Sequence, residues 1–490
     1  MKRAFLFLIL IYSGALLSAQ PKQEIRAVWL TTNYGLDWPR KPIRSITDIE
    51  EQKEELDRIL DNLQRSHINV VFLQTRLRGD VIYRSDIEPY SEYVQTGWQF
   101  RDIYDPLAYA VEACHKRGIE CHAWFVTYPL GQEKVGSKSK QTRAVVRNKE
   151  SVRTHKGELY LDPGDPKTTS YLLSLIKEIV SSYDIDGIHL DYIRYPDRAT
   201  SFPDQFTYKL YGKGKDKNAW RRENINRFVY AAYDTVKALK PWVQVSSSVV
   251  GMYSKIPGNT QRHWTAYHDV YQDPADWMEK GKQDFIVPMM YYKENLFFPF
   301  VQDWQSRCND RFVVPGLGLY QMDKNESDWE SDIIIEQLRY SRTKQVNGNA
   351  FYRAKHLLNN KKGVLDGIRN EFYTTPAVLP PLTWLSDSIP DKPSAIYAES
   401  NKNTLKLSWE NAFQNDGSLF YNLYRSKDFP VDLDDPENLI AVRLKDEYFE
   451  IPIDNSVESG FYYVVTSYDR YHNESEASWP AFFVTGNFEK

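Results

Sequence analysis

The chain has 490 residues, which is enough for two or three domains of ordinary size. Hydrophobic residues make up 42% and charged residues 26%, a globular balance that excludes a mostly disordered chain. The 62 Lys and Arg residues against 66 Asp and Glu give a formal net charge of -4, which excludes a surface that is basic throughout. Nucleic acid is therefore not an expected partner.

Residues 1–19 have the pattern of an export signal. Lys2 and Arg3 precede an apolar stretch from Phe5 to Leu17, and Ser18-Ala19 offers small residues before a cleavage point. No later stretch reaches about 18 uninterrupted apolar residues. We therefore expect a signal peptide, a periplasmic or extracellular protein, and no integral membrane span after signal cleavage. An uncleaved N-terminal anchor is the alternative.

The sequence contains no metal or cofactor motif. Three cysteines are too few for a disulfide framework, and there is no CxxC, no HExxH and no close His pair. No glycine-rich phosphate loop opens any of the helical stretches. We expect neither a metal nor an organic cofactor, and we interpret the cysteines as buried free thiols.

From residue 24 to about 360, apolar strand-like runs alternate with amphipathic helical stretches. The eight runs are Arg26–Thr31, Asn69–Thr75, Glu120–Val126, Gly187–Tyr192, Val243–Val249, Phe285–Tyr291, Phe312–Leu317 and Gly348–Tyr352. Helical patterns such as Ile46–Gln64 and Pro106–Lys116 lie between them, the second ending just before Gly118. Eight strand-then-helix units over roughly 340 residues predict an α/β fold, the (β/α)8 TIM barrel, rather than a doubly wound open sheet.

A second, smaller domain is expected after the barrel. Prolines recur in 376–392, which we interpret as a semi-rigid linker. In 393–490, runs such as Thr404–Trp409 and Phe461–Ser467 alternate like strands between polar turns. This pattern predicts a small all-β sandwich of the immunoglobulin or fibronectin III type. The barrel domain is assigned to 20–375, and few contacts are expected to cross the linker.

Polar side chains at the ends of several predicted strands indicate an active site. In a TIM barrel the site lies at the C-terminal strand ends, and alternate residues of each strand face the lumen. In Gly187–Tyr192 this alternation places His189 and Asp191 on the lumen face. The same rule groups polar or aromatic residues on other strands: Gln74 with Arg76, His122 with Trp124, and Met289 with Tyr291. A carboxyl at the depth of Asp191 requires a partner or a chemical function.

Ordinary structural roles are the alternative for these residues. Asp191 would then be a buried ion-pair partner of Arg76 or Arg78. Buried histidines such as His122 and His189 are more often hydrogen-bonded core residues than catalysts. The sequence alone leaves both interpretations open.

Motifs spread in order over the whole barrel region resemble those of one family. They are Arg26–Leu30, Gln74–Asp80, Tyr104–Ala108, His122–Phe125, Leu161–Pro166, Asp186–Tyr192, Arg194–Pro196, Trp220–Asn224, Pro288–Tyr292 and Gly316–Tyr320. Together they resemble the glycosyl-hydrolase-like family related to family 10 glycosidases, also known as the divisome-localised glycosyl hydrolase family. The predicted sandwich is not part of the resemblance.

The resemblance implies a glycoside hydrolase that acts on bacterial cell-surface glycan, with denuded peptidoglycan strands as the family's substrate. A polysaccharide or peptidoglycan strand is then the expected partner, together with cell-surface or divisome association. Two departures bear on specificity: Tyr192 stands where many members have a second acid, and Met289 stands where many have Gln. A weaker likeness of Tyr183–Asp191 to chitinase-type barrels lacks their catalytic Glu, because Ile193 holds that position.

Hydrolysis of a glycosidic bond needs an acid for the leaving oxygen and a second group at the anomeric carbon. Asp191 is the first candidate for a catalytic carboxylate, Glu294 is its candidate partner, and Asp80 is the reserve. A solvated loop acid and a turn residue are the structural alternatives for Glu294 and Asp80. The candidate substrate-binding residues, which would orient the sugar or tune the acid, are Arg76, Arg78, His122, Trp124, Tyr128, His189 and Tyr291.

Arg76 and Arg78 also suggest a preference within this substrate class. Muramic acid has a lactyl carboxylate that is free only after the stem peptide is removed, and Arg binds carboxylates through two parallel hydrogen bonds. We expect peptide-free strands to be cut faster than peptide-bearing ones, unless both arginines pair with Asp80 and Asp191. The competing function is a catalytically inactive barrel that binds glycan, with the sandwich as an adhesion or spacer module.

Overall fold

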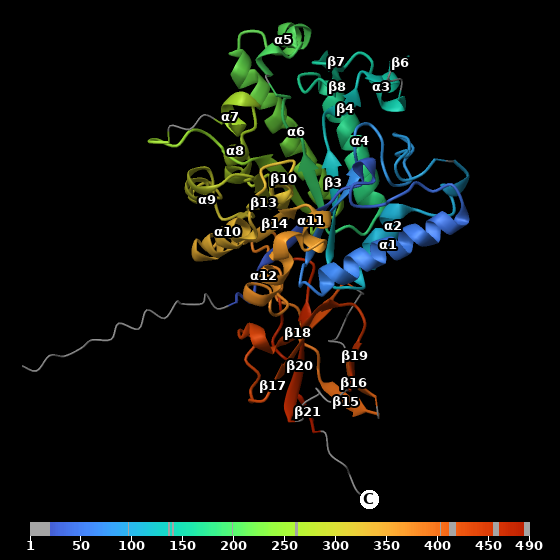
Figure 1. Cartoon of the computed structure of the whole chain (residues 1–490), viewed down its shortest axis with the longest axis vertical. Helices are drawn as coiled ribbons and strands as arrows, with labels where there is room; N and C mark the ends of the chain where they lie inside the picture. Colours follow the sequence, from blue (N-terminus) through green and yellow to red (C-terminus); the bar gives the residue numbers. More distant parts are fainter. Residues whose placement is uncertain are drawn as a thin grey trace, which may run out of the picture.

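The chain folds into a closed parallel barrel followed by a smaller all-β unit (Figure 1). The computed structural model describes residues 20–484 apart from 97, 136–137, 140–141, 198, 260–262, 402, 411–417 and 454–459. The expected signal peptide at 1–19 lies outside the described residues. Within the described part of the chain, no helix is long and apolar enough to cross a membrane.

Eight strand positions close the barrel, which confirms the fold class predicted from the sequence. In chain order they are β1 (Ile25–Leu30), β2 (Val70–Arg76), β3 (Glu120–Val126), β9 (Gly187–Asp191), β10 (Gln244–Val250), β11 (Phe285–Met289), the pair β12 (Phe312–Val313) and β13 (Gly316–Gly318), and β14 (Gly348–Tyr352). Neighbouring strands are parallel throughout, and β14 pairs with β1 to close the ring. The seventh position is interrupted at Pro315, which has no N–H for the ladder.

Helices cover the outside of this ring. The main ones are α1 (Ile46–Gln64), α2 (Pro106–His115), α4 (Pro166–Ser182), α6 (Lys217–Leu239), α8 (Pro274–Glu279), α9 (Phe298–Gln305), α10 (Ser331–Thr343) and α12 (Val364–Glu371). Three of them begin with an Asp-Pro pair, in which Asp105, Asp165 or Asp273 accepts bonds from backbone N–H groups of the first turn. The proline fits this position because it has no N–H to leave unpaired. Two of the family-like motifs therefore mark helix starts.

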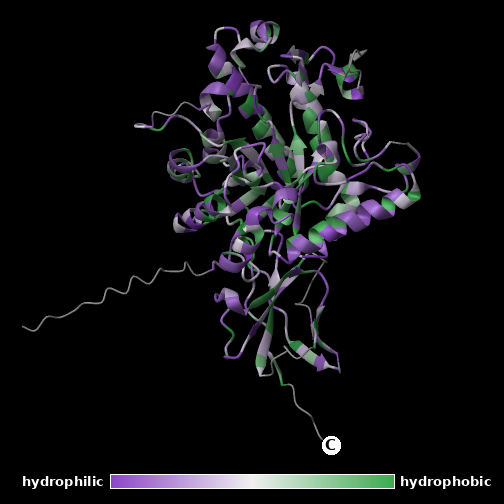
Figure 2. Ribbon diagram, in the orientation of Figure 1, coloured by the Kyte–Doolittle hydropathy of each residue, from purple (hydrophilic) through white to green (hydrophobic). Residues whose placement is uncertain are grey.

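The barrel strands have two buried faces. Trp29, Phe72 and Phe285 belong to a cluster that fills the lumen, whereas alternate residues such as Leu30 and Leu73 pack against the helices. Figure 2 shows hydrophobic colour on the central strands, surrounded by helices of mixed colour. The alternation used to sort lumen residues from helix-facing ones therefore holds for most of the barrel.

Two insertions extend the barrel beyond the C-terminal ends of its strands. Between β3 and α4 lies a small antiparallel sheet of β4 (Pro129–Gln132), β8 (Glu158–Leu161) and β7 (Val152–His155). Between β9 and α6 lie a long loop and α5 (Gln205–Tyr211). Both insertions stand at the top of Figure 1, on the side away from the all-β unit. The sequence pattern predicted only long loops here.

The C-terminal residues form two antiparallel sheets, in agreement with the expected small all-β unit. One contains β15 (Ile396–Ser400), β16 (Thr404–Trp409) and β19 (Tyr448–Pro452); the other contains β18 (Leu439–Leu444), β17 (Phe420–Ser426), β20 (Phe461–Tyr468) and β21 (Ala481–Phe483). Leu407, Trp409 and Tyr421 are buried in one core cluster of this unit. Its assignment to the fibronectin III type stays a prediction.

The stretch 376–392, predicted as a semi-rigid linker, packs against the barrel over its first residues. Val378 forms a parallel bridge with the chain just ahead of β1. Leu379 is buried in the lumen cluster, so it seals the N-terminal end of the barrel. Gln20, the first described residue, donates its side-chain N–H to the carbonyl of Thr375 at 2.8 Å. The first and last residues of the barrel domain therefore meet at the N-terminal end of the barrel.

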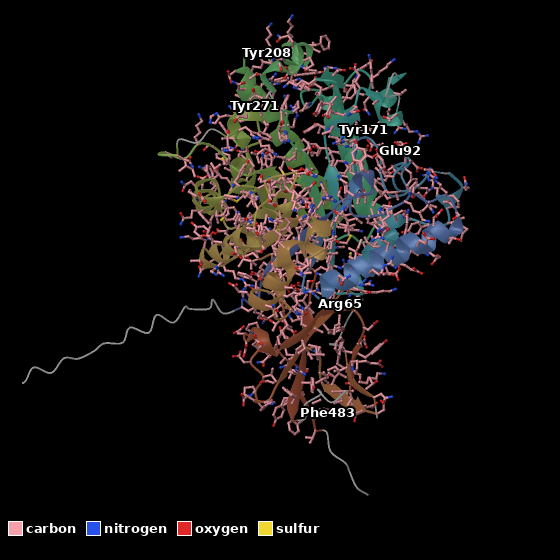
Figure 3. All side chains as sticks on the ribbon, in the orientation of Figure 1. Arg65, Glu92, Tyr171, Tyr208, Tyr271 and Phe483 are labelled. Atoms are coloured by element: carbon pink, nitrogen blue, oxygen red, sulfur yellow. The ribbon has the colours of Figure 1, made fainter. Side chains whose placement is uncertain are left out.

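A buried ion cluster joins the all-β unit to the barrel; Figure 3 labels Arg65, which lies at the junction of the two. Arg443 of β18 donates to Glu120 at 2.6 Å and to Asp186 at 2.8 Å, at the starts of β3 and β9. His472 contacts the same Glu120 oxygen at 2.8 Å. These four side chains are all buried. The expectation of few contacts across the linker is wrong, because the barrel carboxylates take their counter-charges from the C-terminal unit.

Candidate active site

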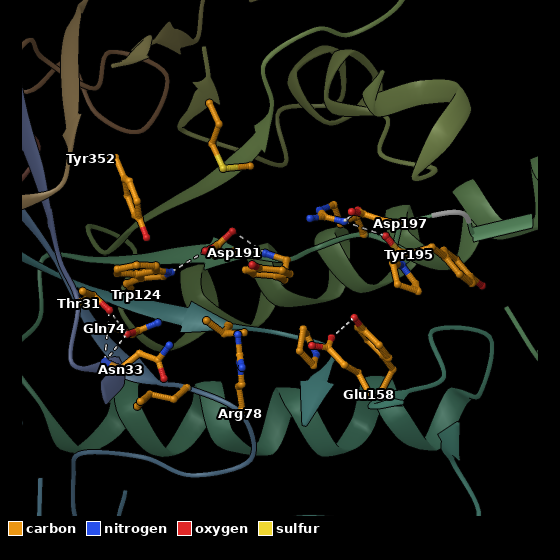
Figure 4. Close-up of a pocket in the computed structure, with 18 of the residues that line it drawn as sticks. Thr31, Asn33, Gln74, Arg78, Trp124, Glu158, Asp191, Tyr195, Asp197 and Tyr352 are labelled. Carbon is orange, nitrogen blue, oxygen red and sulfur yellow. Dashed lines mark hydrogen bonds and ion pairs between the residues drawn. The ribbon is translucent and has the colours of Figure 1, made fainter. Parts of the chain in front are cut away.

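A cavity of about 560 Å³ opens at the C-terminal ends of the barrel strands (Figure 4). Six barrel strands contribute to its floor through residues within two positions of their C-terminal ends: Thr31, Gln74, Trp124, Asp191, Met289 and Tyr352. The two insertions supply its rim: His155, Lys156, Glu158, Tyr160, Tyr192, Arg194, Tyr195, Pro196 and Asp197. The cavity therefore occupies the place where TIM barrels carry their active sites.

Asp191 is the buried carboxyl on the cavity floor. One of its oxygens accepts a hydrogen bond from the indole Nε1 of Trp124 at 2.9 Å, and the other accepts one from the backbone N–H of Tyr192 at 2.7 Å (Figure 4). Burial raises the pKa of Asp191 above its usual value, although the two hydrogen bonds and the charge of Arg194 act in the opposite direction. A carboxyl in this environment stays protonated to higher pH than an exposed one.

Aromatic rings form one wall of the cavity. The rings of Tyr291 and Tyr352 stack with centroids 5.6 Å apart. Tyr320 meets both of them edge-on, at 5.5 Å and 5.7 Å. Together with Trp124, these rings provide flat apolar faces beside a buried carboxyl, a combination that suits the binding of sugar rings.

The structure corrects the predicted position of Arg76. A β-bulge shifts the register of β2 against β3, so that Gln74 lies opposite Trp124 but Arg76 lies opposite Phe125. The extra residue turns Arg76 from the lumen to the helix-facing layer. There it pairs with the buried carboxylate of Glu88 at 2.7 and 2.8 Å and donates to carbonyls of the loop after β3. Its side chain does not line the cavity, and it does not pair with Asp191.

Arg76→Lys is accordingly expected to reduce stability without changing substrate preference. Lysine keeps the charge but cannot reproduce the forked bonds to Glu88, and the loss is expected to be roughly 2–4 kcal/mol of unfolding free energy. Urea unfolding gives the stability, and digestion of peptide-free and peptide-bearing strands gives the preference. A changed preference at unchanged stability would show that Arg76 contacts the substrate.

The two predicted histidines do face the lumen, but they lie beneath the cavity. The ring nitrogens of His189 lie 2.8 Å from the hydroxyls of Ser246 and Ser248, and burial lowers the pKa of this histidine well below its usual value. His122 Nε2 lies 2.9 Å from a carboxylate oxygen of Glu120. Neither histidine lines the cavity, so the structure agrees with the core role that the sequence left open.

Three other predicted residues also lie outside the cavity. Tyr128 packs against Phe228 in the helix-facing core, with ring centroids 5.9 Å apart. Asp80 lies in the turn after β2. Glu294 begins an exposed 3₁₀ turn past β11, where the chain has already left the barrel end. The predicted residues that do line the cavity are Arg78, Trp124, Asp191 and Tyr291.

The rim contains charged residues that the sequence analysis did not identify as site residues. The carboxylate of Glu158 on β8 accepts a hydrogen bond from the hydroxyl of Tyr160 at 2.6 Å. Arg194 and Asp197 pair at 3.2 Å on the loop after β9. In the sequence, Arg194 belongs to the family-like motif Arg194–Pro196. Asp197 directly follows this motif, and no motif contains Glu158. Among the described residues, no group of three or more His, Cys, Asp or Glu side chains is placed to hold a metal ion.

Sequence comparison identifies the family to which this cavity belongs. Residues 24–321 match the model described as glycosyl hydrolase-like 10. The chain belongs to the glycosyl hydrolase-like 10 family. The matched segment runs from the residue before β1 to just past β13, so it contains most of the barrel and most of the cavity.

Two curated relatives of the glycosyl hydrolase-like 10 protein are each 31% identical to it. Glycosyl hydrolase YngK of Bacillus subtilis strain 168 matches over 486 residues, covering 94% of both chains. Glycosyl hydrolase DigH of Escherichia coli strain K12 matches over 356 residues, covering 68% of this chain and 74% of DigH. The match to YngK is long enough to include most of the C-terminal all-β unit. The solved glycoside hydrolase domain of PgaB from Bordetella bronchiseptica is 15% identical, with a TM-score of 0.49 over 71% of this chain and 99% of that domain, a likeness that carries no argument about function.

Proposed function

We propose that the protein is a glycoside hydrolase in which Asp191 is the general acid. The observation that carries the proposal is the carboxyl of Asp191, buried on the floor of an aromatic-walled cavity, where burial raises its pKa. An acid that protonates a leaving glycosidic oxygen must hold its proton near neutral pH, which burial favours. Membership of a glycosyl hydrolase-like family supports the same reaction.

The surroundings of Asp191 suit both its protonated form, before the transfer of the proton, and its ionised form afterwards. Its protonated carboxyl donates to the glycosidic oxygen as the bond between that oxygen and the anomeric carbon breaks. The negative charge left on Asp191 is then stabilised by the N–H groups of Trp124 and Tyr192, which already point at its two oxygens. Water completes the reaction at the anomeric carbon, with help from a second carboxylate.

Glu158 replaces Glu294 as the candidate for that second carboxylate, because Glu158 lines the cavity and Tyr160 orients it. Glu158→Gln is expected to lower kcat by about 10²- to 10⁴-fold with little change in KM, since the amide cannot act as a base or nucleophile. Release of reducing ends measures the rate. Glu294→Gln, an exposed acid outside the cavity, serves as the matched control and is expected to stay near wild type. Full activity in Glu158→Gln together with its loss in Asp197→Asn would assign the role to Asp197.

The proposed substrate is the amino-sugar glycan of the bacterial cell wall, in its peptide-free form. The support for this substrate is the motif resemblance together with the cations Arg78, Lys156 and Arg194 at the cavity. The signal-like pattern of residues 1–19 supports export to the periplasm or the cell exterior, where this polymer lies. The resemblance alone supports association with the cell surface or the divisome.

Digestion of purified peptidoglycan tests the proposal directly. The full chain is incubated with intact strands, with strands stripped of stem peptides, and with a panel of other polysaccharides, and the products are identified by mass spectrometry. Peptide-free strands are expected to release fragments at least about tenfold faster than intact ones, a difference that one charge-assisted contact can supply. Binding to several glycans without cleavage of any would instead favour the inactive glycan-binding barrel.

A further inference from the structure

Arg194 in the cavity wall contacts two aromatic rings. Its guanidinium carbon lies 5.0 Å from the ring centroid of Tyr192 and 5.0 Å from that of Trp264. The side chain is 11% exposed, and it lines the cavity. Cation–π contacts to two rings fix the planar group in one orientation.

The guanidinium of Arg194 has more N–H donors than its partners use. One terminal nitrogen donates to the carbonyl of Tyr195 at 3.3 Å and to Asp197 at 3.2 Å. The other terminal nitrogen and Nε have no hydrogen-bond partner within the described part of the chain. Because Asp197 is 71% exposed, its ion pair with Arg194 is weak and open to competition. A nearly buried cation with open donors is prepared to bind an anion.

Arg194 lies three residues after Asp191, on the loop that leaves β9. Both residues line the same cavity, so an anion bound to Arg194 would share that cavity with the carboxyl of Asp191. The cavity is lined by three cations, Arg78, Lys156 and Arg194, and by three carboxyl groups. While Asp191 carries its proton, the cations exceed the charged carboxylates, and the cavity favours an anionic substrate.

We propose that Arg194, in contact with the rings of Tyr192 and Trp264, forms a subsite for a carboxylate on the sugar adjoining the scissile bond. This inference rests on the proposed function and narrows the substrate to glycans with free carboxylates. A carboxylate matches the planar fork of a guanidinium through two parallel hydrogen bonds, which a hydroxyl or an amidated carboxyl cannot form. The sequence analysis gave this role to Arg76 and Arg78, and Arg194 takes the place of Arg76, which lies outside the cavity.

The test compares two substrates that differ at one group, a lactyl carboxylate or the uncharged alcohol made from it. Peptide-free strands are used as prepared, or after their lactyl carboxylates have been activated with carbodiimide and reduced with borohydride to alcohols. Wild-type kcat/KM is expected to be about 10- to 100-fold higher on the carboxylate strands. Arg194→Gln is expected to bring this ratio close to one, because the larger part of its loss of activity falls on the carboxylate strands. Arg222→Gln, an arginine stacked on Tyr267 at 4.2 Å and outside the cavity, is the matched control and is expected to keep the ratio.

Two results would overturn the subsite. An equal loss on both substrates in Arg194→Gln would show a purely structural role, and a wild-type ratio near one would show that no carboxylate is recognised. If the wild type cuts neither substrate, the proposed hydrolysis fails, and binding of the same two strands by calorimetry tests the subsite separately. In that case Arg194→Gln must weaken binding of the carboxylate strands alone, or the subsite is rejected too.

Discussion

Replacing Asp191 with Asn is expected to abolish hydrolysis while the fold and the affinity for glycan remain nearly intact. The amide cannot give a proton to the leaving oxygen, so the rate should fall by about 10³-fold or more. The fold should survive, because Asp191 has no ion pair with any residue that the structure describes and its partners are the N–H groups of Trp124 and Tyr192. An amide oxygen can still accept one of those two bonds, and the variant removes a carboxyl whose charged form burial disfavours.

The pH dependence of Asp191 adds a second measurement. Its folded-state pKa is raised, so ionisation costs stability as pH rises through that pKa, and the wild type should lose both activity and stability in that direction. Asp191→Asn should lack this part of the loss of stability. Thermal unfolding from pH 4 to 8, together with reducing-end release, checks both expectations, with Glu294→Gln as the control. Turnover near wild type would remove Asp191 from the mechanism, and a collapse in Tm would show a structural role.

Replacing Arg443 with Met is expected to cost about 3–5 kcal/mol of unfolding free energy, because Glu120 and Asp186 then remain buried without their shared counter-ion. Lys445→Met is the matched control. Its ammonium lies 3.9 Å from Asp184, and both side chains are close to half exposed, so the loss there should stay under about 1 kcal/mol. Urea denaturation of the full chain measures both variants. A loss in Arg443→Met no larger than in the control would contradict the buried cluster.

The loss of unfolding free energy at acid pH should also change in Arg443→Met. Although burial raises it, contacts with His115 and Arg443 hold the pKa of Asp186 at about 2, and Arg443 and His472 hold that of Glu120 well below its usual value. These lowered pKa values add stability that is present above about pH 4 and is lost as pH falls toward 2. Arg443→Met should therefore lose less stability on acidification than the wild type does.

A 1–375 fragment lacks Arg443, so Glu120 and Asp186 would remain buried without this counter-ion. The fragment is therefore expected to be insoluble or unstable.

The sequence was a good guide wherever strands kept a regular alternation. The apolar runs predicted all eight barrel strand positions, and parity along Gly187–Asp191 placed Asp191 at the cavity floor. The same parity misplaced Arg76, because a bulge in β2 leaves no signature in residue types. A rule that counts residues cannot detect one residue that is left unpaired in the ladder.

Long-range contacts were the other source of error. Arg443 lies on a short strand of the C-terminal unit, where a charged residue is typical of a solvated face, yet its partner Glu120 is 323 residues away. Glu158 lies on a four-residue strand within an insertion, and only its packing over the barrel end brings it to the cavity. Such placements depend on tertiary packing, which local residue patterns do not encode.

The contact between Gln20 and Thr375 has a consequence for how the protein can be attached to a surface. Both the entry of the chain and the C-terminal all-β unit lie at the sealed end of the barrel, and the cavity opens at the other end (Figure 1). A tether ahead of Gln20, or a tag after the last strand, leaves the mouth of the cavity pointing away from the support. A chain anchored in this way would act on polymer that lies beyond its anchoring surface, rather than on the surface itself.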